Sequence, residues 1–339
     1  MGTFLKRHHW ITPLALLAPG GLWLLVFYVY PAFQMFLASL WSGSLETGYT
    51  LSLDNWVNYP NSLVKYAPFF LRSIVYAAAA TTTTFLIAYP LAYTIAFKGG
   101  RYKNLLLFLV VAPFFTSFLL RTFSWQVILG DDGPVLGLLK TIHLLPETFR
   151  VLATPMAVIA GITYNFLPFM TLPVYVALEK VDFRLVEAAR DLYAGPWRPG
   201  GAIVGGIVGG VLLGVLGIVF NGSAILFALA GAAVGALIFH FLVSESFIRV
   251  TFPLSVSGVF AGGLLTFIPA IGDYINAELL GNPGTNMIGN VIQNKFLTQN
   301  DYPIASTLSF ILMAGVLVVV TIYARVLGTE ELSAAAARA

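Results

Sequence analysis

The sequence predicts an all-α polytopic membrane protein. Of its 339 residues, 58% are hydrophobic and only 10% are charged, whereas about 25% of the residues of a soluble domain are charged. Charge-free stretches of about 20 residues, long enough for a helix to cross a bilayer, recur along the chain without the polar–apolar alternation of membrane-barrel strands. The chain has no cysteine, which excludes disulfides, thiol catalysis and cysteine-ligated metal sites.

These charge-free stretches predict eight membrane-spanning helices. The stretch Pro199–Ser244 is too long for one helix, and the turn signal Asn221-Gly222-Ser223 lies near its middle. We therefore expect two helices there, within 201–220 and 224–243. The other six are expected within Trp10–Leu45, Ser73–Phe97, Asn104–Leu120 (continuing past Arg121 to Gly130), Val151–Leu178, Val250–Gly272 and Tyr302–Ala324.

The distribution of Lys and Arg sets the expected orientation, because cytoplasmic loops carry an excess of these residues. Twelve of them lie in the two termini and in the connections 98–103, 179–198 and 245–249, and five lie in the opposite set of connections. Both termini are therefore expected in the cytoplasm. The first apolar stretch is too long for a secretory signal, so we expect it to remain as a membrane helix.

One short stretch, EKVDFRLVEAARDLYAGPWRPGG at 179–201, is densely charged. Asp182 is a suitable cap for a helix over 183–194, and Gly195-Pro196 is a suitable stop. The expected apolar face of this helix comprises Leu185, Ala188, Ala189 and Leu192. The charged residues around that face are Arg184, Glu187, Arg190 and Asp191. The pattern predicts a short cytoplasmic amphipathic helix, which is either an ordinary solvated loop helix or an element that docks into a partner's groove.

Glu187-Ala188-Ala189 resembles the EAA signature of ABC-importer permeases, and the surrounding text is similar to the spermidine/putrescine branch of that family. The similar stretches are YPLAYTIA (89–96), APFFTSFLLRTFSW (112–125), YNFLPFMTLPVYVALEKVD (164–182), EAARDL (187–192), FIRVTFPLSVSGVFAGGLLTFIPAIGDY (247–274), ELLGNPGTNMIGNVI (278–292) and DYPIAS (301–306). They cover nearly the whole chain except about 198–245. The LLGNP and MIGNVI segments resemble the B-type permease more than its C-type partner.

The resemblance implies a type I (MetI-like) importer transmembrane domain with six core helices. In that family, the EAA loop docks a short coupling helix into the ATPase subunit. The residues to which the resemblance assigns this coupling are Leu185, Glu187, Ala188, Ala189, Arg190, Asp191 and Leu192.

The chain departs from the family pattern just after this helix. Tyr193 stands where the family has a glycine, and Pro253 follows it after 253 − 193 = 60 residues, a far longer interval than in the family. We therefore expect a permease domain formed by 1–197 and 245–339, split by an inserted hydrophobic glycine-rich hairpin at 198–244. Because two added helices return the chain to the same side, the expected orientation of the later helices is preserved. The hairpin is expected either to dock an extra subunit or lipid, or to pack mainly on itself.

Ionisable and aromatic residues near the membrane are the candidates for a solute path, because burying charge in a bilayer is costly. The resemblance implies a polyamine substrate, which would need carboxylates and aromatic faces for cation–π contact. The candidate residues are Arg121, Trp125, Tyr164, Asp273, Tyr274 and Glu278. In the alternative interpretation, Asp273 and Glu278 are hydrated loop residues and the aromatic residues belong to the core or the membrane interface.

The chain itself is expected to have no catalytic residue, cofactor or metal. It contains no G-x-x-x-x-G-K-[ST] phosphate loop, and its four histidines form no metal-binding pattern. The resemblance implies a permease subunit in a bacterial inner membrane. Its implied partners are a second permease subunit, an ATPase dimer that binds ATP and Mg²⁺, an external solute-binding protein and membrane lipid, with no nucleic acid. The alternative is an ion-coupled secondary transporter, which should show internal inverted repeats; none is visible in the sequence.

Overall fold

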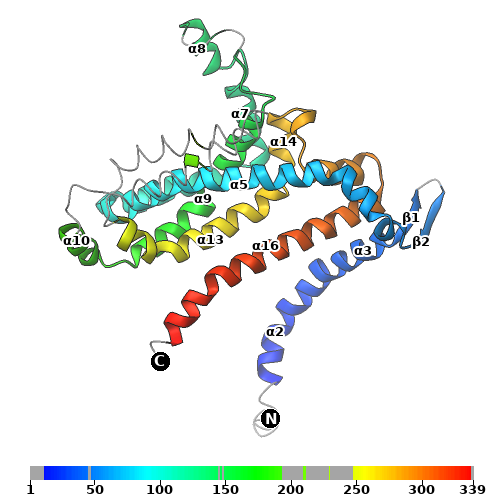
Figure 1. Cartoon of the computed structure of the whole chain (residues 1–339), viewed down its shortest axis with the longest axis horizontal. Coiled ribbons are helices and arrows are strands. Elements are labelled where there is room, and N and C mark those ends of the chain that lie inside the picture. The colour runs from blue at the N-terminus through cyan, green and yellow to red at the C-terminus, as the bar shows by residue number, and fades with distance from the viewer. Residues whose placement is uncertain are drawn as a thin grey trace. The chain divides into compact units, whose positions relative to one another are not determined.

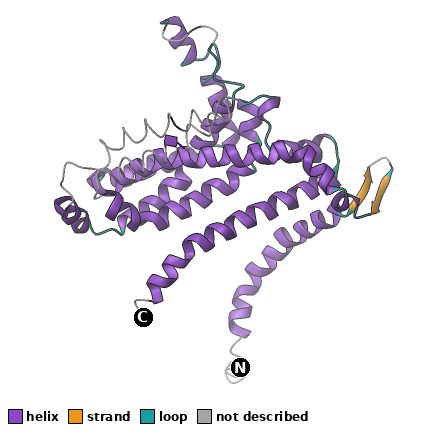
Figure 2. Ribbon diagram, viewed as in Figure 1, coloured by secondary structure: helices purple, strands orange, loops and turns teal. Residues whose placement is uncertain are grey.

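The computed structural model describes residues 11–44, 47–143, 146, 149–192, 209–210, 229 and 247–336. These residues are mostly helical, with one two-stranded hairpin (Figure 2). The chain divides into two compact units, Met1–Tyr66 with Val291–Ala339, and Ala67–Asn290. The predicted insertion 198–244 lies outside the described residues, apart from 209, 210 and 229, so its helical hairpin stays a prediction.

Five of the predicted spans are confirmed among the described residues. Five helical stretches are long and apolar enough to cross a membrane, and a bent pair of helices makes a sixth if it is one span. The five are Leu16–Ser39, Val64–Lys98, Pro155–Glu179, Phe247–Ile271 and Tyr302–Ile322.

The third predicted span is not one straight helix. Helix α6 (Lys103–Val111) continues as a 3-10 turn, η3 (Ala112–Phe115), and α7 (Phe118–Ile128) then leaves at an angle of 94°. Thr116 has extended backbone angles, φ −102° and ψ 149°, and the backbone N–H and hydroxyl of Thr116 both donate to the Pro113 carbonyl. A continuous helix over Asn104–Gly130 was therefore the wrong expectation, because the chain turns sharply after Pro113.

The first unit is built on two long helical stretches. The first comprises α2 (Ile11–Leu24), η1 (Leu25–Val29) and α3 (Tyr30–Ser39), and the second is α16 (Tyr302–Ala336). Helix α3 packs against α16, where the rings of Phe36 and Phe310 meet edge to face at 5.6 Å. The Thr307 hydroxyl donates to the Ser39 carbonyl at 3.4 Å.

Short elements complete this unit. Strands β1 (Trp41–Ser44) and β2 (Gly48–Leu51) form an antiparallel hairpin in which Trp41 lies opposite Leu51, a small exception to the all-helical expectation. Gly43 has φ +121°, a left-handed conformation that side chains disfavour. The remaining elements are α4 (Asp54–Val57), the start of α5 (Tyr59–Lys98), the last residues of α15 (Ile288–Gln293) and η6 (Asn294–Thr298).

The second unit is organised around α9 (Pro155–Glu179). Thr154 caps this helix by accepting from the backbone N–H of Ala157, and Pro155 occupies the first turn, where proline is favoured. Helices α5, α9 and α13 (Phe252–Ile271) run side by side (Figure 1). The other elements of the unit are η2 (Gly100–Tyr102), α6, η3, α7, α8 (Leu136–Thr141), α10 (Phe183–Leu192), η4 (Phe247–Thr251), α14 (Ile275–Leu280), η5 (Pro283–Thr285) and the first residues of α15.

In the core of this unit, buried side chains of α5, two of them alanines, pack against larger side chains of α9. On α5, Ala88, Ala92 and Ile95 are fully buried. They form one cluster with residues of α9, namely Met170, Val174, Tyr175 and Leu178. Because lipid is as apolar as these side chains, close packing rather than exclusion from water holds the helices together.

Two glycines of α13 make its contact with α9 especially close. A Cβ atom at Gly258 would lie 2.5 Å from the Pro173 carbonyl oxygen and 2.5 Å from the Ala177 Cβ. A Cβ at Gly262 would lie 2.8 Å from the Met170 sulfur and 3.0 Å from its Cα. The two glycines are four residues apart, the small-xxx-small spacing that lets membrane helices approach closely.

Replacing Gly258 with alanine is therefore expected to destabilise the protein. The added methyl group has no space, and overpacking of this kind costs about 1–3 kcal/mol. Gly315→Ala in α16 is the matched control, since a Cβ there meets nothing within 4 Å. Thermal unfolding of the detergent-purified proteins should show a lower midpoint for Gly258→Ala alone; equal midpoints for the two variants would contradict the close contact.

Candidate functional site

The predicted amphipathic helix is present at one end of the second unit, where α10 follows α9 after the residues 180–182. Asp182 Oδ1 accepts a hydrogen bond from the Arg184 backbone N–H at 2.9 Å, and the Asp182 carbonyl accepts from Leu185 at 3.0 Å. This confirms that Asp182 caps the helix. The helix is described as far as Leu192, and the predicted end at Ala194 lies outside the described residues.

Helix α10 has one face turned to its own chain and another turned outward. Val186 and Ala189 are 2% and 5% exposed, and α10 contacts η4. Leu185 and Leu192 are 52% and 76% exposed, and Glu187, Ala188 and Asp191 are also exposed. Ala189 was predicted to share one apolar face with Leu185, Ala188 and Leu192, but it is buried like Val186, whereas the other three are exposed.

An open cavity of about 650 Å³ lies beside α10. Its walls come from α9 and α13, and Leu185 of α10 is one of its lining residues. At the same end, Lys103 Nζ meets Glu179 Oε1 at 2.6 Å and joins the start of α6 to the end of α9. Since this ion pair is partly exposed, it orients the two ends more than it stabilises them.

A buried polar cluster joins α7, α9 and α14. Asn165 Nδ2 donates to Asn276 Oδ1 at 3.1 Å and to Thr122 Oγ1 at 3.3 Å. Asn276 Nδ2 donates to Asp273 Oδ2 at 2.7 Å, and the Asn276 backbone N–H donates to Asp273 Oδ1 at 2.9 Å. No member of the cluster is more than 7% exposed. Because buried polar groups need hydrogen-bond partners inside the protein, these bonds fix three helices relative to one another.

Sequence reasoning missed three members of this cluster. Thr122, Asn165 and Asn276 carry no charge and no aromatic ring, so they were not among the ionisable and aromatic candidates. Two features of the sequence could have indicated the polar cluster. Asn165 is an amide within the apolar stretch 151–178, and Asp273 precedes Asn276 by three residues, the spacing at which a carboxylate accepts from a backbone N–H.

Asp273 is not the hydrated loop residue of the alternative interpretation. It is 7% exposed and follows α13 directly. Burial raises the pKa of Asp273 from its ordinary value of 3.8 to about 6, although the hydrogen bonds from Asn276 and Ile275 act in the opposite direction. The carboxylate therefore serves the internal cluster, and contact between Asp273 and a solute stays a prediction.

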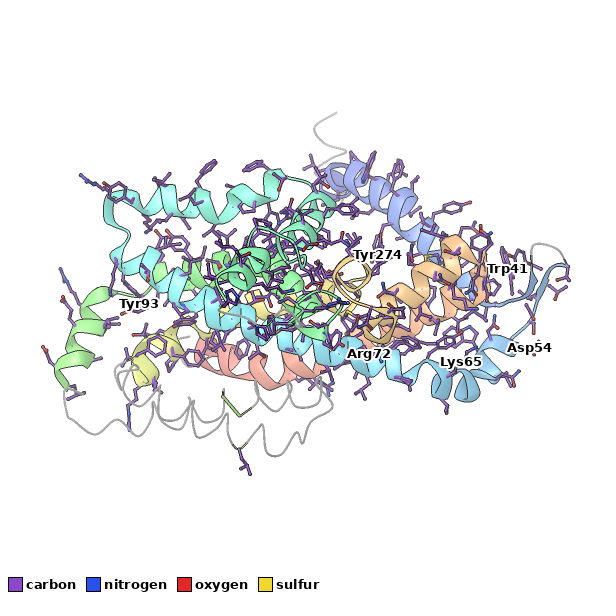
Figure 3. The ribbon with its side chains drawn as sticks, turned by 90° about the horizontal axis from the view of Figure 1, so that it is seen from above. Trp41, Asp54, Lys65, Arg72, Tyr93 and Tyr274 are labelled. Atoms are coloured by element: carbon purple, nitrogen blue, oxygen red, sulfur yellow. The ribbon has the colours of Figure 1, made fainter. Side chains whose placement is uncertain are left out.

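The other candidates of the predicted path lie at different places in the unit. The rings of Trp125 and Tyr164 meet edge to face at 5.2 Å. Tyr274 is 39% exposed, and Glu278 is also exposed. Figure 3 shows Tyr274 and Arg72 toward the end of the unit opposite Tyr93. Trp125 and Tyr164 therefore lie together, whereas Tyr274 and Glu278 are exposed, and a common solute path for the six candidates stays a prediction.

Arg121 lies on α7 between aromatic rings. Its guanidinium carbon is 5.1 Å from the centre of the Phe114 ring and 5.8 Å from that of Phe118. Its Nε and Nη1 atoms are buried and have no hydrogen-bond partner among the described residues.

The segment after Tyr274 is held by hydrogen bonds between side chains and the main chain. The Tyr274 carbonyl accepts from Asn290 Nδ2 at 2.9 Å, and the Asn290 side-chain oxygen accepts from the Met287 backbone N–H at 3.0 Å. Arg72 Nη1 donates to the Asn286 carbonyl at 2.7 Å, which joins α5 to the same segment.

Comparison with known proteins identifies the family. No family model matches the chain. The spermidine/putrescine transport system permease protein PotB of Haemophilus influenzae is 32% identical over 305 residues, which cover 89% of this chain and 90% of that protein. This chain is an ABC-transporter permease of the PotB family. PotB of Escherichia coli K12 is 30% identical to the permease over 261 residues, 77% of each chain.

A solved structure supports the fold of the permease. A chain of a bacterial alginate ABC transporter, crystallised with an alginate pentasaccharide-bound periplasmic protein, superposes with a TM-score of 0.55 over 96% of each chain. The two sequences are 17% identical, so this likeness concerns the fold. The permease is accordingly a multi-pass inner-membrane protein with the type I importer fold, and family membership decides against an ion-coupled secondary transporter.

The position of Asp273 predicts a pH dependence for the stability of the permease. Because its folded pKa of about 6 lies above 3.8, the folded protein binds this proton more tightly than the unfolded chain does. The contribution of Asp273 to the free energy of unfolding should therefore fall as the pH rises from about 4 to 6, by up to ~1.4 kcal/mol per pH unit.

Asp273→Asn should remove this pH-dependent contribution to the free energy of unfolding, because an amide does not ionise between about pH 4 and pH 6. Thermal unfolding midpoints of the two proteins between pH 4 and pH 7.5 measure the difference. Glu278→Gln is the control at an exposed acid nearby, and it should keep the wild-type profile. If the unfolding midpoints of wild type and Asp273→Asn changed in parallel with pH, the raised pKa of Asp273 would be contradicted.

Proposed function

We propose that the permease forms part of the path through which an ATP-driven importer carries a polyamine, such as spermidine or putrescine, into the cell. The similarity to PotB proteins over nine-tenths of a relative's length carries this proposal. The relatives are named for spermidine/putrescine transport. An external binding protein would deliver the solute, and the periplasmic protein bound to the alginate importer supports this arrangement.

The remaining partners follow from what the chain lacks and where its charges lie. The sequence has no phosphate loop, so ATP and Mg²⁺ would bind to a pair of separate ATPase subunits. A second permease subunit would complete the path. The excess of Lys and Arg in alternate connections supports a cytoplasmic position for both termini and for α10.

Helix α10 is suited to transmit movement from the ATPase. Its outward face presents Leu185, Ala188 and Leu192, and its inward face contacts η4, which leads directly into α13. Closure of the ATPase pair would push α10 and with it two helices at once, α9 through residues 180–182 and α13 through η4. The open cavity between α9 and α13 lies where such a movement would act.

The exposed candidates suggest an order of contacts along the path. Tyr274 and Glu278 are exposed near the predicted outer end, where a carboxylate would attract a cation leaving the binding protein. Trp125 and Tyr164 offer aromatic faces on α7 and α9, which attract ammonium groups by cation–π contact.

Uptake by the assembled transporter tests the substrate. Cells that express all the subunits should accumulate radiolabelled spermidine, and an excess of putrescine should reduce this accumulation at least tenfold. An anionic solute at the same concentration is the matched competitor and should have no effect. A phosphate-loop lysine substitution in the ATPase should abolish uptake, whereas spermidine uptake that survives it would contradict an ATP-driven mechanism.

Ala188→Asp in α10 tests the coupling contact. A carboxylate at this outward position would be buried without a partner when the ATPase docks, at a penalty of several kcal/mol, so association should be lost. Ala188→Ser, which adds a small uncharged group, is the control and should retain the ATPase. Pull-down of the ATPase from detergent extracts with equal amounts of each permease variant measures the effect. Undiminished pull-down with Ala188→Asp would exclude α10 as the docking element.

A further inference from the structure

Two polar contacts attach the bent span formed by α6, η3 and α7 to α9. At one end, Lys103 Nζ at the start of α6 meets Glu179 Oε1 at the end of α9 at 2.6 Å. At the other end, Asn165 Nδ2 of α9 donates to Thr122 Oγ1 of α7 at 3.3 Å. The bent span is therefore joined to α9 by one polar contact on each side of its 94° bend.

Apolar contacts lie between these two. The Phe114 and Phe169 rings meet edge to face at 4.9 Å, and Leu106, Leu107 and Val110 of α6 pack against the buried cluster of α5 and α9. Such contacts depend on the fit of the surfaces alone, because lipid is equally apolar. A hydrogen-bonded ion pair has defined partner atoms, so the polar contacts set the position of the bent span along α9.

Lys103 and Glu179 depend on each other. Lys103 is the first residue of α6 and Glu179 is the last of α9, and the helix dipole disfavours a cation at the first position and an anion at the last. Lys103 Nζ also lies 5.2 Å from the centre of the buried Tyr175 ring. Because the side chains of Lys103 and Glu179 are 29% and 48% exposed, their pairing adds little to stability and mainly holds two helix ends together.

Glu179 lies immediately before the amphipathic helix. Only residues 180–182 separate it from Phe183, where α10 begins. This junction is itself hydrogen-bonded, since the Val181 backbone N–H donates to the Leu178 carbonyl at 3.1 Å. A displacement of α10 therefore reaches the end of α9 at Glu179, and the nearest attachment of another helix described there is the ion pair with Lys103.

We propose that Lys103 and Glu179 are positioning residues for transport, whose ion pair transmits the movement of α10 to α6 and, through η3, to α7. The bent span then follows α9 as one body. The proposal rests on the proposed function, which supplies the ATPase that moves α10. Its consequence for the solute path is that Trp125 of α7 and Tyr164 of α9, with ring centres 5.2 Å apart, stay together as the helices move.

Transport per ATP hydrolysed tests the ion pair in the full transporter reconstituted in vesicles. Glu179→Gln and Lys103→Gln should each retain the ATPase subunits and ATP hydrolysis, but the spermidine imported per ATP should fall at least fivefold. The reversed pair, Lys103→Glu with Glu179→Lys, should recover at least half of the wild-type ratio because the attraction is restored. Lys295→Gln is the matched control, since it breaks a pair of 2.9 Å within the other unit, and it should keep the wild-type ratio.

A wild-type ratio in both single variants overturns the proposal. Loss of the ATPase subunits from the Glu179→Gln transporter also overturns it and places Glu179 in the docking contact. Equal losses in the single variants and in the reversed pair overturn it as well, because the attraction between the two charges then has no effect on transport.

A distance measurement tests the common movement independently of the substrate. Leu105→Cys on α6 and Val176→Cys on α9 place two spin labels at exposed positions in a chain without other cysteines, with partner subunits that also lack cysteine. The distance between the labels should be the same with and without a non-hydrolysable ATP analogue, and Glu179→Gln should make it change. A change without that substitution overturns the proposal. If the unsubstituted transporter imports no spermidine, the proposed substrate fails, whereas the label distance still tests the movement of α6 with α9.

Discussion

The close approach of α13 to α9 governs the arrangement of the second unit. Gly258 and Gly262 bring the two helices together at positions where a methyl group has no room. A membrane protein gains little from hiding apolar groups from lipid, so its helices depend on such contacts and on internal polar bonds. Helix α9 meets α5 through Met170 and Val174, and it meets α7 and α14 through Asn165. Each candidate functional residue of this unit lies on α9 or on a segment next to it in the chain or in space.

At the end of this unit near α10, aromatic packing around the start of α13 allows a displacement of α10 to reach that helix. Phe247 and Phe252, at the start of the η4–α13 segment, surround Tyr89 of α5 with ring-centre distances of 5.3 and 5.9 Å. The Tyr89 and Ser255 hydroxyl groups are 2.6 Å apart. The start of α13 is thus held by α5 on one side and by α10 on the other. A displacement of α10 therefore cannot be absorbed by a loose loop at η4, and it reaches the body of the helix.

The sequence predicted the spans well because a charge-free stretch of sufficient length has few alternatives in a membrane protein. It also predicted the cap at Asp182, since the signal is local. It did not predict the bend after Pro113, because proline is tolerated in membrane helices, as Pro168 and Pro173 of α9 show. The inward position of Ala189 and the burial of Asp273 depend on contacts with η4 and Asn276, and periodicity contains no information about such partners.

The contact between α10 and η4 has a consequence for the chain that connects them. Residues 193–246, 54 in all, connect α10 to η4, and these two elements contact each other. Both ends of this connection are therefore held by described segments that contact each other directly. This contact makes the connection a natural place to divide the polypeptide, so that two fragments, 1–192 and 247–339, retain the surfaces through which they recognise each other.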